Sequence, residues 1–497
     1  MKKRWNIVFG GSAGTGPNFL THLLGEALVS RGYYVFYSRD YQSLIRGGHN
    51  FNHLTFSNEP VYSNDSKIDV LVCLDEKTEN IHKKNLNKNG KILKGHSENT
   101  YYAGALFKLF GIEFKVLEKE LKKEHNYKEN IQYAKQGYNE EKNNLYKIIS
   151  KKSANYFING SQGISQGAIN SGLDIYYAYP MTPATPVLTE LAQKQERKNF
   201  LVIELENEIA VANAGVGSAI TGAKTMVGTS GGGFDLMTET LSLCGMAEIP
   251  LVFYLAQRPG PATGVPTYTA QGDLNMARHC SHGEFPRIVL APGDPKESQE
   301  LVNQAFYFSQ KFKTPSTIIS DKHLAESFYT LKEKPKIISI AKTNSLERYN
   351  SYEKDSEGSA TDISELINKN FEKRLKKQKD IEKNSKKFSK YSVYGNKNSK
   401  NSVVSWGSTK GAILDAIKNL NCRFIQIKYI EPFPKEIEKK LKNKNLILIE
   451  NNATGQLGNL IAEKTGIFIQ DKNKILKYDG RPFLCDELNK EIRERLK

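Results

Sequence analysis

The first hundred residues alternate between short apolar runs and a glycine-rich turn that leads into a helical pattern. The run WNIVFGG at residues 5–11 precedes residues 12–32, whose apolar positions recur at helical spacing, and a second β-rich run, YYVFYS, follows at residues 33–38. This order predicts a βαβ unit. The apolar run KIDVLVCLD at residues 67–75 is typical of a strand buried on both faces. We therefore predict a first α/β domain over residues 1–117.

A second and a third block show the same alternation farther along the chain. Residues 153–342 contain strand-like segments separated by stretches of helix length, which predicts one open parallel sheet. These segments are DIYYAYP, FLVIEL, AKTMVGTS, PLVFYLA and PRIVLAP. Residues 401–497 contain the strand-like runs SVVSW, RFIQIKY and NLILIEN and predict a smaller C-terminal α/β domain. The fold class is therefore α/β, with several open parallel-sheet domains.

Two charged segments separate these blocks. Residues 118–152 are dominated by Lys, Glu, Asn and Tyr and are interpreted as a charged helical connector. Residues 343–400 are polar and poor in apolar periodicity, which favours a mobile linker that includes some helix. Residues 372–400 hold eleven Lys/Arg and three Asp/Glu, a net charge of +8 out of +17 for the whole chain. Because the excess collects in one solvated segment, a nucleic-acid-binding protein is not expected.

Length and cysteine usage narrow the class of protein further. The 497 residues suit three or four domains at about 100 to 200 residues each. The five cysteines form no C-x-x-C pair, so we expect no iron–sulfur or zinc site within this chain, and isolated thiols suit a reducing cytoplasm. There is no run of 18 apolar residues and no signal-peptide pattern at the N-terminus. We expect a cytoplasmic protein without a membrane segment.

The glycine-rich turn at residues 10–16 exposes backbone N–H groups at the start of a helix, where an anion is favoured. A dinucleotide fingerprint is incomplete here, because Gly14 and Gly16 are followed by Phe19 where a third glycine belongs. Asp40 does lie about 20 residues farther on, as that fingerprint requires. The pattern favours another phosphate-bearing ligand over a nicotinamide or flavin nucleotide or a purely structural turn.

Three loops in the second block follow predicted strands, where α/β sheets bind ligands. The loop YPMTPATP at residues 179–186 is stiffened by three prolines, although a tight connection capped by Thr182 explains it equally well. The glycines of residues 228–239, GTSGGGFDLMTE, allow close backbone approach to a ligand. Arg258, in AQRPGPATG, suits a carboxylate or a phosphate, or is a surface arginine on a proline-rich loop.

The stretch ELENEIAVANAGVGSAITGA places three carboxylates at a strand end, before a helix of small apolar residues. Glu204 and Glu206 are explained by the helix dipole alone. Glu208 lies where small side chains imply close packing, so its carboxyl would be desolvated and would resist ionising unless it hydrogen-bonds a partner. Such an environment suits a group that shares a proton.

Together these stretches resemble the α subunit of the 2-oxoacid:ferredoxin oxidoreductases, in the form with the γ domain fused at its N-terminus. GGSAGTG and SLIRGGHN resemble the γ domain, and VVSWGST and IENNATGQL resemble the C-terminal domain. The pyrimidine-binding domain is matched by YPMTPATP, ELENEIA, GTSGGGFDLMTE, QRPGPATG and TYTAQGDL. The resemblance covers most of the chain outside the charged segments. It implies a thiamine-diphosphate pyrimidine-binding domain and a transketolase C-terminal-like domain.

The resemblance also implies roles for particular residues. Glu208 matches the glutamate that hydrogen-bonds N1′ of the aminopyrimidine, which favours the imino form that removes the C2 proton. Thr182 matches the threonine near the substrate carboxylate, and Arg258 occupies a position where a cation could hold that carboxylate. Cofactor binding is further assigned to Tyr179, Pro180, Gly231 and Gly232.

Other parts of the active complex are expected on separate chains. No GDG motif for the diphosphate and Mg²⁺ and no cysteine cluster is present, so both the magnesium and the iron–sulfur centre are expected on a β subunit, with ferredoxin as electron acceptor and an α2β2 assembly. Coenzyme A is expected on the γ domain, where Gly14, Gly16 and Arg46 are possible contacts. A surface turn explains Arg46 at least as well.

The predicted reaction is the oxidative decarboxylation of 2-oxoglutarate to an acyl-coenzyme A. Three residues depart from the family pattern, Gln162 and Gly163 where Glu-Ala is frequent and Gln166 where an apolar residue is usual, and the arginine loop reads RPGPATG rather than RGGPSTG. A pyruvate or branched-chain 2-oxoacid enzyme therefore remains an alternative. A nicotinamide-dependent oxidoreductase is a more distant one.

Overall fold

The computed structural model describes residues 3–42, 48–150, 155–342, 349–442 and 444–496. The chain forms two compact units. The first comprises residues 1–158, 327–333 and 483–489, and the second comprises residues 159–326, 334–482 and 490–497. Within the described ranges, no helix has the length and apolar character that crossing a membrane requires.

The sheet of the first unit has the strand order β5-β4-β1-β3-β2-β13-β6 in the described part of the chain. Its strands are β1 (Arg4–Ser12), β2 (Tyr34–Asp40), β3 (His49–Ser57), β4 (Ile68–Cys73), β5 (Leu86–Leu93), β6 (Tyr156–Asn159) and β13 (Phe328–Leu331). The strands β1 and β2 run parallel to each other, as a βαβ unit requires, but β3 lies between them and pairs antiparallel with both. This sheet is therefore mixed rather than parallel. The sequence analysis did not predict β3, because its polar-rich sequence gives no strand signal of its own.

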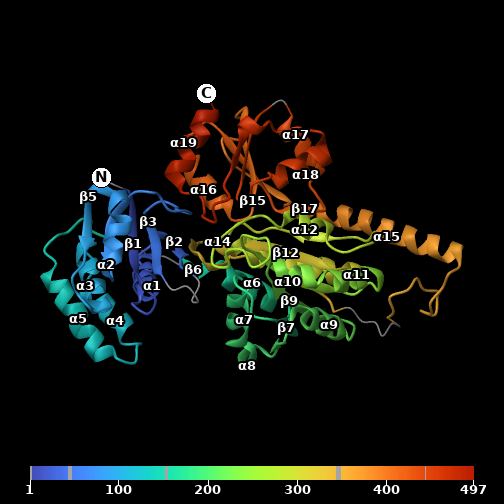
Figure 1. Ribbon diagram of the computed structural model, residues 1–497, viewed down its shortest axis with the longest axis horizontal. Helices are drawn as coiled ribbons and strands as arrows, with labels where there is room; N and C mark the ends of the chain where they lie inside the picture. The colour runs from blue at the N-terminus through green and yellow to red at the C-terminus, as the bar shows by residue number, and fades with distance from the viewer. Residues whose placement is uncertain (1–2, 43–47, 151–154, 343–348, 443, 497) are drawn as a thin grey trace. The chain divides into compact units, whose positions relative to one another are not determined.

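The helices of the first unit are α1 (Pro17–Val29), α2 (Glu76–His82), α3 (Asn99–Leu109), α4 (Phe114–Leu121) and α5 (Tyr127–Glu140), with the short 3-10 turn η1 (Lys83–Asn85). Figure 1 shows α3, α4 and α5 together beside the strands of this unit. The contact between α3 and α5 is very close. A Cβ at Gly104 would lie 1.8 Å from the Ala134 carbonyl oxygen, and a Cβ at Gly137 would lie 2.0 Å from that of Tyr101. The segment expected to be a connector thus supplies a helix to the core of this unit.

The large sheet of the second unit has the order β17-β11-β12-β10-β9-β7-β8. Its strands are β7 (Ile175–Ala178), β8 (Leu201–Glu204), β9 (Thr225–Thr229), β10 (Leu251–Gln257), β11 (Ile288–Leu290), β12 (Ser316–Asp321) and β17 (Tyr429–Glu431). All neighbours from β8 to β11 pair in parallel, and only the edge strand β17 is antiparallel. The five predicted strands of this block are all present, and the predicted α/β class with parallel-rich sheets is confirmed.

The helices that follow these strands are α6 (Gly160–Asn170), α7 (Thr185–Ala192), α8 (Gln195–Lys198), α9 (Glu208–Ala219), α10 (Gly231–Leu236), α11 (Thr238–Met246), α12 (Leu274–His279), α13 (Pro295–Phe312) and α14 (Lys322–Glu326). Two departures from the family pattern have a structural reason at the start of α6. Gln162 completes a capping box, because its N–H donates to Asn159 Oδ1 at 2.8 Å and its Oε1 accepts from the Asn159 N–H at 3.1 Å. A Cβ at Gly163 would lie 2.6 Å from the Pro295 carbonyl oxygen, so this glycine lets α13 approach.

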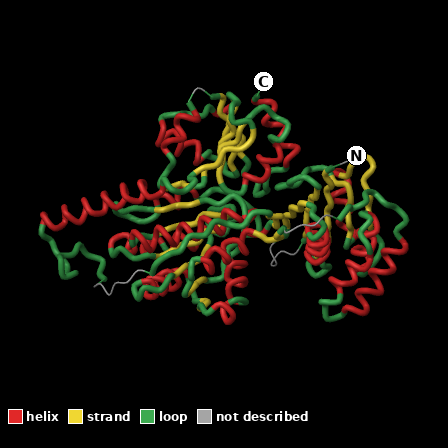
Figure 2. The backbone as a smooth tube through the Cα atoms, turned by 180° about the vertical axis from the view of Figure 1, so that it is seen from behind, coloured by secondary structure: helices red, strands yellow, loops and turns green. Residues whose placement is uncertain are grey.

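The C-terminal part of the second unit adds a smaller sheet of order β14-β16-β15-β18-β19, seen as the upper group of strands in Figure 2. Its strands are β14 (Tyr391–Gly395), β15 (Asn401–Trp406), β16 (Arg423–Ile427), β18 (Asn445–Glu450) and β19 (Lys474–Leu476). Its helices are α16 (Thr409–Ala416), α17 (Glu438–Leu441) and α18 (Gln456–Thr465), with η2 (Lys435–Ile437) and η3 (Asp471–Asn473). The last helix, α19 (Cys485–Arg495), begins in the first unit and ends in the second. One apolar cluster joins both sheets, since Phe253 and Leu274 belong to the same buried group as Trp406 and Leu457.

The lysine-rich segment contains a 22-residue helix, α15 (Ser364–Ser385), drawn in orange in Figure 1. Ile381 on this helix is fully buried. Glu248, just after α11, forms one ion pair with Lys373 at 2.7 Å and a second with Lys377. These contacts anchor the helix to the second unit, so part of the positive charge of the segment is neutralised rather than solvated.

We expect this anchoring to weaken in acid. Burial alone would raise the pKa of Glu248, but Lys377 and Lys373 outweigh it and lower the pKa to about 2. Because this value lies below that of an unfolded glutamate, the ion pairs stabilise the fold above about pH 5, and this stability is lost as the pH falls toward 2. Glu248→Gln should remove this acid dependence and lower the free energy of unfolding at pH 7 by on the order of 2 kcal/mol. Urea unfolding between pH 3 and 7 measures both effects.

Glu239→Gln is the matched control, because Glu239 is an exposed carboxylate on α11 itself. This variant should keep the wild-type dependence on pH. An E248Q protein whose unfolding free energy still falls between pH 5 and 3 as steeply as that of the wild type would contradict the assignment.

Candidate functional site

Three predicted loops meet at one edge of the large sheet. The strands β7, β9 and β10 are adjacent and parallel, so their carboxyl ends lie side by side. The loop at residues 179–186 follows β7, the glycine-rich turn at residues 230–233 follows β9, and the arginine loop at residues 258–264 follows β10. This edge is the place where open α/β sheets bind ligands.

Glu208 begins α9 and is buried, with 4% of its surface exposed. Its backbone is fixed by the N-cap Asn207, whose side chain accepts from the Ala210 N–H at 2.9 Å. Its Oε1 atom is buried and makes no hydrogen bond to the part of the chain that the structure describes. A buried carboxyl oxygen without a partner is costly, so this atom requires a hydrogen-bonding group from a ligand or another chain.

The glycine turn makes room for this carboxyl group. A Cβ at Gly233 would lie 2.6 Å from Glu208 Oε1 and 2.1 Å from Thr229 Oγ1. Any larger residue at this position would displace the acid. The predicted residue Gly232 is exposed, and a Cβ there would meet only the Ala262 carbonyl oxygen, at 3.9 Å.

Arg258 and Thr182 are brought together by the fold. One guanidinium nitrogen of Arg258, Nη1, donates to the Thr182 carbonyl oxygen at 2.7 Å, which joins the ends of β10 and β7. Burial lowers the pKa of Arg258, and the carboxylates of Asp273 and Glu208 act in the opposite direction. The cation therefore lies in the electrostatic field of both acids, at a site that is partly desolvated.

Asp273 lies at this site but was not among the residues predicted from the sequence. It precedes α12, and its Oδ2 lies 2.8 Å from the position that a Cβ would take at Gly231. Burial raises the pKa of Asp273 to about 6, with a further increase from Asp235 and a smaller opposing effect of Arg258. The sequence TYTAQGDL contained this acid, but nothing in its spacing showed that it would face the glycine turn.

Tyr179 and Pro180 lie at the rim of the site. Both are exposed, Tyr179 to 38% of its surface. Their assignment to cofactor binding remains a prediction.

The glycine-rich turn of the first unit joins β1 to α1. Gly14 and Gly16 have φ angles of +90° and +86°, which only glycine adopts readily, and Gly16 is the N-cap of α1. The turn is closed by Thr15, whose Oγ1 donates to the Ser12 carbonyl oxygen at 2.8 Å. Arg46 lies outside the described residues. The proposed coenzyme A contacts thus remain predictions.

The described residues contain no group of three metal-ligating side chains. The five cysteines form no disulfide bond within the described residues, and four of them are buried. The residues present fit the aminopyrimidine half of thiamine diphosphate. The buried Oε1 of Glu208 has no partner in the described residues and is available to a ring nitrogen, and Gly233 leaves room for the Glu208 side chain. No comparable group for a diphosphate–metal pair is present in the described ranges.

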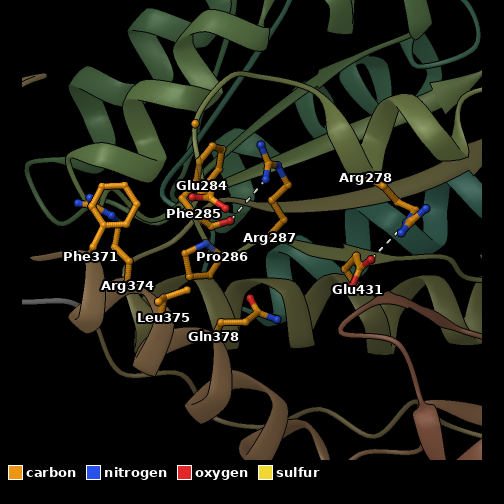
Figure 3. A pocket seen from close by; sticks show the side chains of 11 residues that line it. Arg278, Glu284, Phe285, Pro286, Arg287, Phe371, Arg374, Leu375, Gln378 and Glu431 are labelled. Carbon is orange, nitrogen blue, oxygen red and sulfur yellow. Dashed lines mark hydrogen bonds and ion pairs between the residues drawn. The ribbon is translucent and has the colours of Figure 1, made fainter. Parts of the chain in front are cut away.

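A separate cleft of about 290 Å³ lies between α15 and the loop after α12 (Figure 3). Three arginines line it, but they are already engaged. Arg278 pairs with Glu431 at 3.2 Å and Glu463 at 2.8 Å, while Arg374 pairs with Glu353. Arg287 stacks on the Phe285 ring and donates to the Cys280 carbonyl oxygen at 2.9 Å. Two of the three arginines are therefore paired with carboxylates, whereas Arg287 makes no ion pair to the described residues.

The fold and the site define an α/β protein with a buried, unpartnered acid at the carboxyl edge of a parallel sheet. Residues 166–392 match the family model "Pyruvate flavodoxin/ferredoxin oxidoreductase, thiamine diP-bdg", and residues 6–98 match "Pyruvate ferredoxin/flavodoxin oxidoreductase". The chain is 30% identical to the 2-oxoacid:ferredoxin oxidoreductase subunit alpha of a Sulfolobus species, over 99% of this chain and 96% of the relative. The corresponding subunit of Saccharolobus solfataricus is also 30% identical, over 99% and 98%. The chain therefore belongs to the family of 2-oxoacid:ferredoxin oxidoreductase alpha subunits.

Two further proteins are similar to this chain in fold or over part of its length. A 2-oxoglutarate:ferredoxin oxidoreductase from Magnetococcus marinus has the same fold, with a TM-score of 0.89, 22% identity and full coverage of both chains. The 2-oxoglutarate synthase subunit KorA of Archaeoglobus fulgidus is 38% identical over 34% of this chain and 50% of its own length. The predicted family, including the fused N-terminal domain, is confirmed.

Proposed function

We propose that this chain works with a separate β subunit to oxidise 2-oxoglutarate, releasing CO2, forming an acyl-coenzyme A and passing electrons to ferredoxin. The observation that carries the proposal is the buried, unpartnered Oε1 of Glu208 beside the glycine turn. The choice of 2-oxoglutarate is supported by the names of the Archaeoglobus and Magnetococcus proteins. Pyruvate and branched-chain 2-oxoacids are the alternatives.

Glu208 would hold the aminopyrimidine of thiamine diphosphate, which when bound supplies the carbon nucleophile for the 2-oxo group. The role of Glu208 is to share a proton with the ring nitrogen N1′ through Oε1. Burial favours this role, because a desolvated carboxyl group that lacks a partner gains most from such a hydrogen bond. Gly233 leaves room for the Glu208 side chain, because a Cβ there would lie 2.6 Å from Oε1.

Arg258 and Thr182 would orient the substrate. The Thr182 carbonyl oxygen accepts a hydrogen bond from one guanidinium nitrogen of Arg258. The other guanidinium nitrogens remain available for a carboxylate. Because the site is partly desolvated, a carboxylate paired with this cation is held more strongly than it would be in water. The diphosphate, Mg²⁺ and the iron–sulfur cluster are assigned to the β subunit, and ferredoxin and an α2β2 stoichiometry complete the proposal.

Co-expression with the candidate β subunit tests this function. The assembled complex should reduce ferredoxin only when 2-oxoglutarate and coenzyme A are both present, and the chain purified alone should be inactive. Replacing 2-oxoglutarate with pyruvate should lower kcat/KM by at least tenfold. A complex that prefers pyruvate would overturn the substrate assignment, and one that oxidises no 2-oxoacid would overturn the function.

A further inference from the structure

Two Asn-Gly pairs occur in the chain, at residues 89–90 and 159–160. In such a pair the glycine nitrogen can attack the asparagine side-chain carbon, because glycine has no side chain to hinder the approach. The backbone must be free to bring the two atoms together, and the asparagine side chain must be free to turn. The structure separates the two pairs by both criteria.

Asn89 and Gly90 lie in an irregular part of β5, the edge strand of the first unit's sheet. β5 pairs with β4 on either side of residues 87–90, but over these residues β4 has only Asp69 to set against them. The chain is strongly bent here, because a Cβ at Gly90 would lie 2.6 Å from Leu86 Cγ. The pair is therefore outside the regular ladder of the sheet.

The side chain of Asn89 is exposed and makes no hydrogen bond to the residues that the structure describes. The asparagine at the start of the same segment is anchored, since Asn87 Nδ2 donates to Asp69 Oδ1 at 2.5 Å. Lys88, between the two asparagines, is exposed as well. The Asn-Gly pair thus occupies the free end of the bent segment, where local motion costs little.

The second pair is fixed at the start of α6. Asn159 is the N-cap of this helix, and its Oδ1 accepts from the Gln162 N–H at 2.8 Å, while its own N–H donates to Gln162 Oε1 at 3.1 Å. Gly160 is buried, and a Cβ there would lie 2.2 Å from the Leu324 carbonyl oxygen. Ring closure at this pair would have to break the capping box and the packing of the helix.

We propose that Asn89 is a site of spontaneous deamidation through a succinimide ring, whereas Asn159 is protected. The nitrogen of Gly90 forms a bond to Cγ of Asn89, the bond from Cγ to Nδ2 breaks, and ammonia leaves with the proton of the Gly90 N–H. Water then opens the ring at either carbonyl carbon, which yields aspartate or isoaspartate. One water molecule is consumed for each ammonia released, and nothing is oxidised or reduced.

The modification changes both charge and backbone in the first unit, and the inference does not depend on the proposed function. Either product is a carboxylate, which lowers the formal net charge of +17 by one. Isoaspartate also adds one carbon atom to the main chain, two residues before Lys91. Lys91 Nζ lies 2.5 Å from a carboxylate oxygen of Glu141, at the end of α5. This ion pair between β5 and α5 is the contact that the longer backbone displaces.

Peptide mapping by mass spectrometry tests the proposal on the purified full-length chain, kept folded at pH 8.5 and 37 °C. The same chain unfolded in guanidinium chloride gives the intrinsic rate of each pair, and the two rates should be similar. In the folded chain, Asn89 should convert within about threefold of its unfolded rate, and Asn159 at least about tenfold more slowly than its own. Isoaspartate should be among the products at Asn89, because only the ring yields it.

Asn89→Gln is the matched variant, because it keeps an exposed amide at the same position. Glutamine must close a six-membered ring, which forms far more slowly, so the folded variant should gain no carboxylate there. The proposal is overturned if Asn89 of the folded chain converts no faster than Asn159, or if it yields aspartate without isoaspartate. The readout needs no catalytic activity, so an inactive complex would bear on the proposed function alone.

Discussion

Replacing Glu208 with Gln is expected to slow C2-proton exchange in thiamine diphosphate bound to the assembled complex by roughly 10²- to 10⁴-fold, the usual contribution of a positioned acid or base. Gln keeps the volume of the side chain, so the fit against Gly233 and Thr229 should survive. It lacks an oxygen that can share a proton, and the buried Oε1 is the atom that the proposed function uses. The exchange rate is measured by NMR after timed incubation in deuterated buffer and an acid quench.

Glu206→Gln is the control for this experiment. Glu206 lies two residues earlier on the same strand-to-helix connection but is exposed. Its replacement should leave the exchange rate within a factor of two. Unchanged exchange in E208Q, with thiamine diphosphate bound and the complex folded, would remove Glu208 from the mechanism.

Lys410→Met is expected to destabilise the second unit by roughly 3–5 kcal/mol, the cost of removing one partner of a buried ion pair. Lys410, in α16, is 6% exposed and pairs with Asp294 and, at 2.7 Å, with Glu297 at the start of α13. Burial alone would lower the pKa of Lys410, but these two carboxylates raise it well above its usual value. Met fills the space and removes the cation that forms ion pairs with both acids. Urea unfolding at pH 7 measures the loss.

Lys194→Met provides the comparison. Lys194 pairs with Glu190 one turn away on the protein surface, where such a pair contributes about 0.3–0.5 kcal/mol. A loss of less than 1 kcal/mol in K410M would show that the ion pairs of Lys410 contribute little net stability. The triple variant that adds Asp294→Asn and Glu297→Gln to Lys410→Met should recover part of the loss, because both carboxylates that lost their partner are then neutral.

Much of the second unit could be predicted from the sequence because its strands are continuous apolar runs. Parallel strands buried on both faces need such runs, and the five expected segments of this block are all strands of one sheet. The first unit was harder, because β3 has the sequence HNFNHLTFS, in which polar residues outnumber apolar ones by six to three. Its polar side chains bind within the unit, as when Asn52 Nδ2 donates to Thr21 Oγ1 at 3.1 Å. Long-range bonds of this kind leave no local pattern.

The structure of the charged segments also could not be predicted from their composition. The composition of residues 118–152 indicates a connector, yet Gly104 and Gly137 let α5 pack on α3 at backbone distance. Composition reports how a segment interacts with water on average. Whether two particular glycines face each other across a helix pair depends on the tertiary arrangement alone.

The sequence by itself determined the fold class, the family and the candidate acid Glu208, because strand patterns and the loops at strand ends are formed by consecutive residues. Only the tertiary structure decided which of these groups meet. Arg258 reaches the Thr182 carbonyl oxygen and Asp273 covers Gly231 because parallel strands bring separate loops to one edge of the sheet. The desolvation that raises the pKa of Asp273 is a property of that shared edge, and no single stretch of the chain contains it.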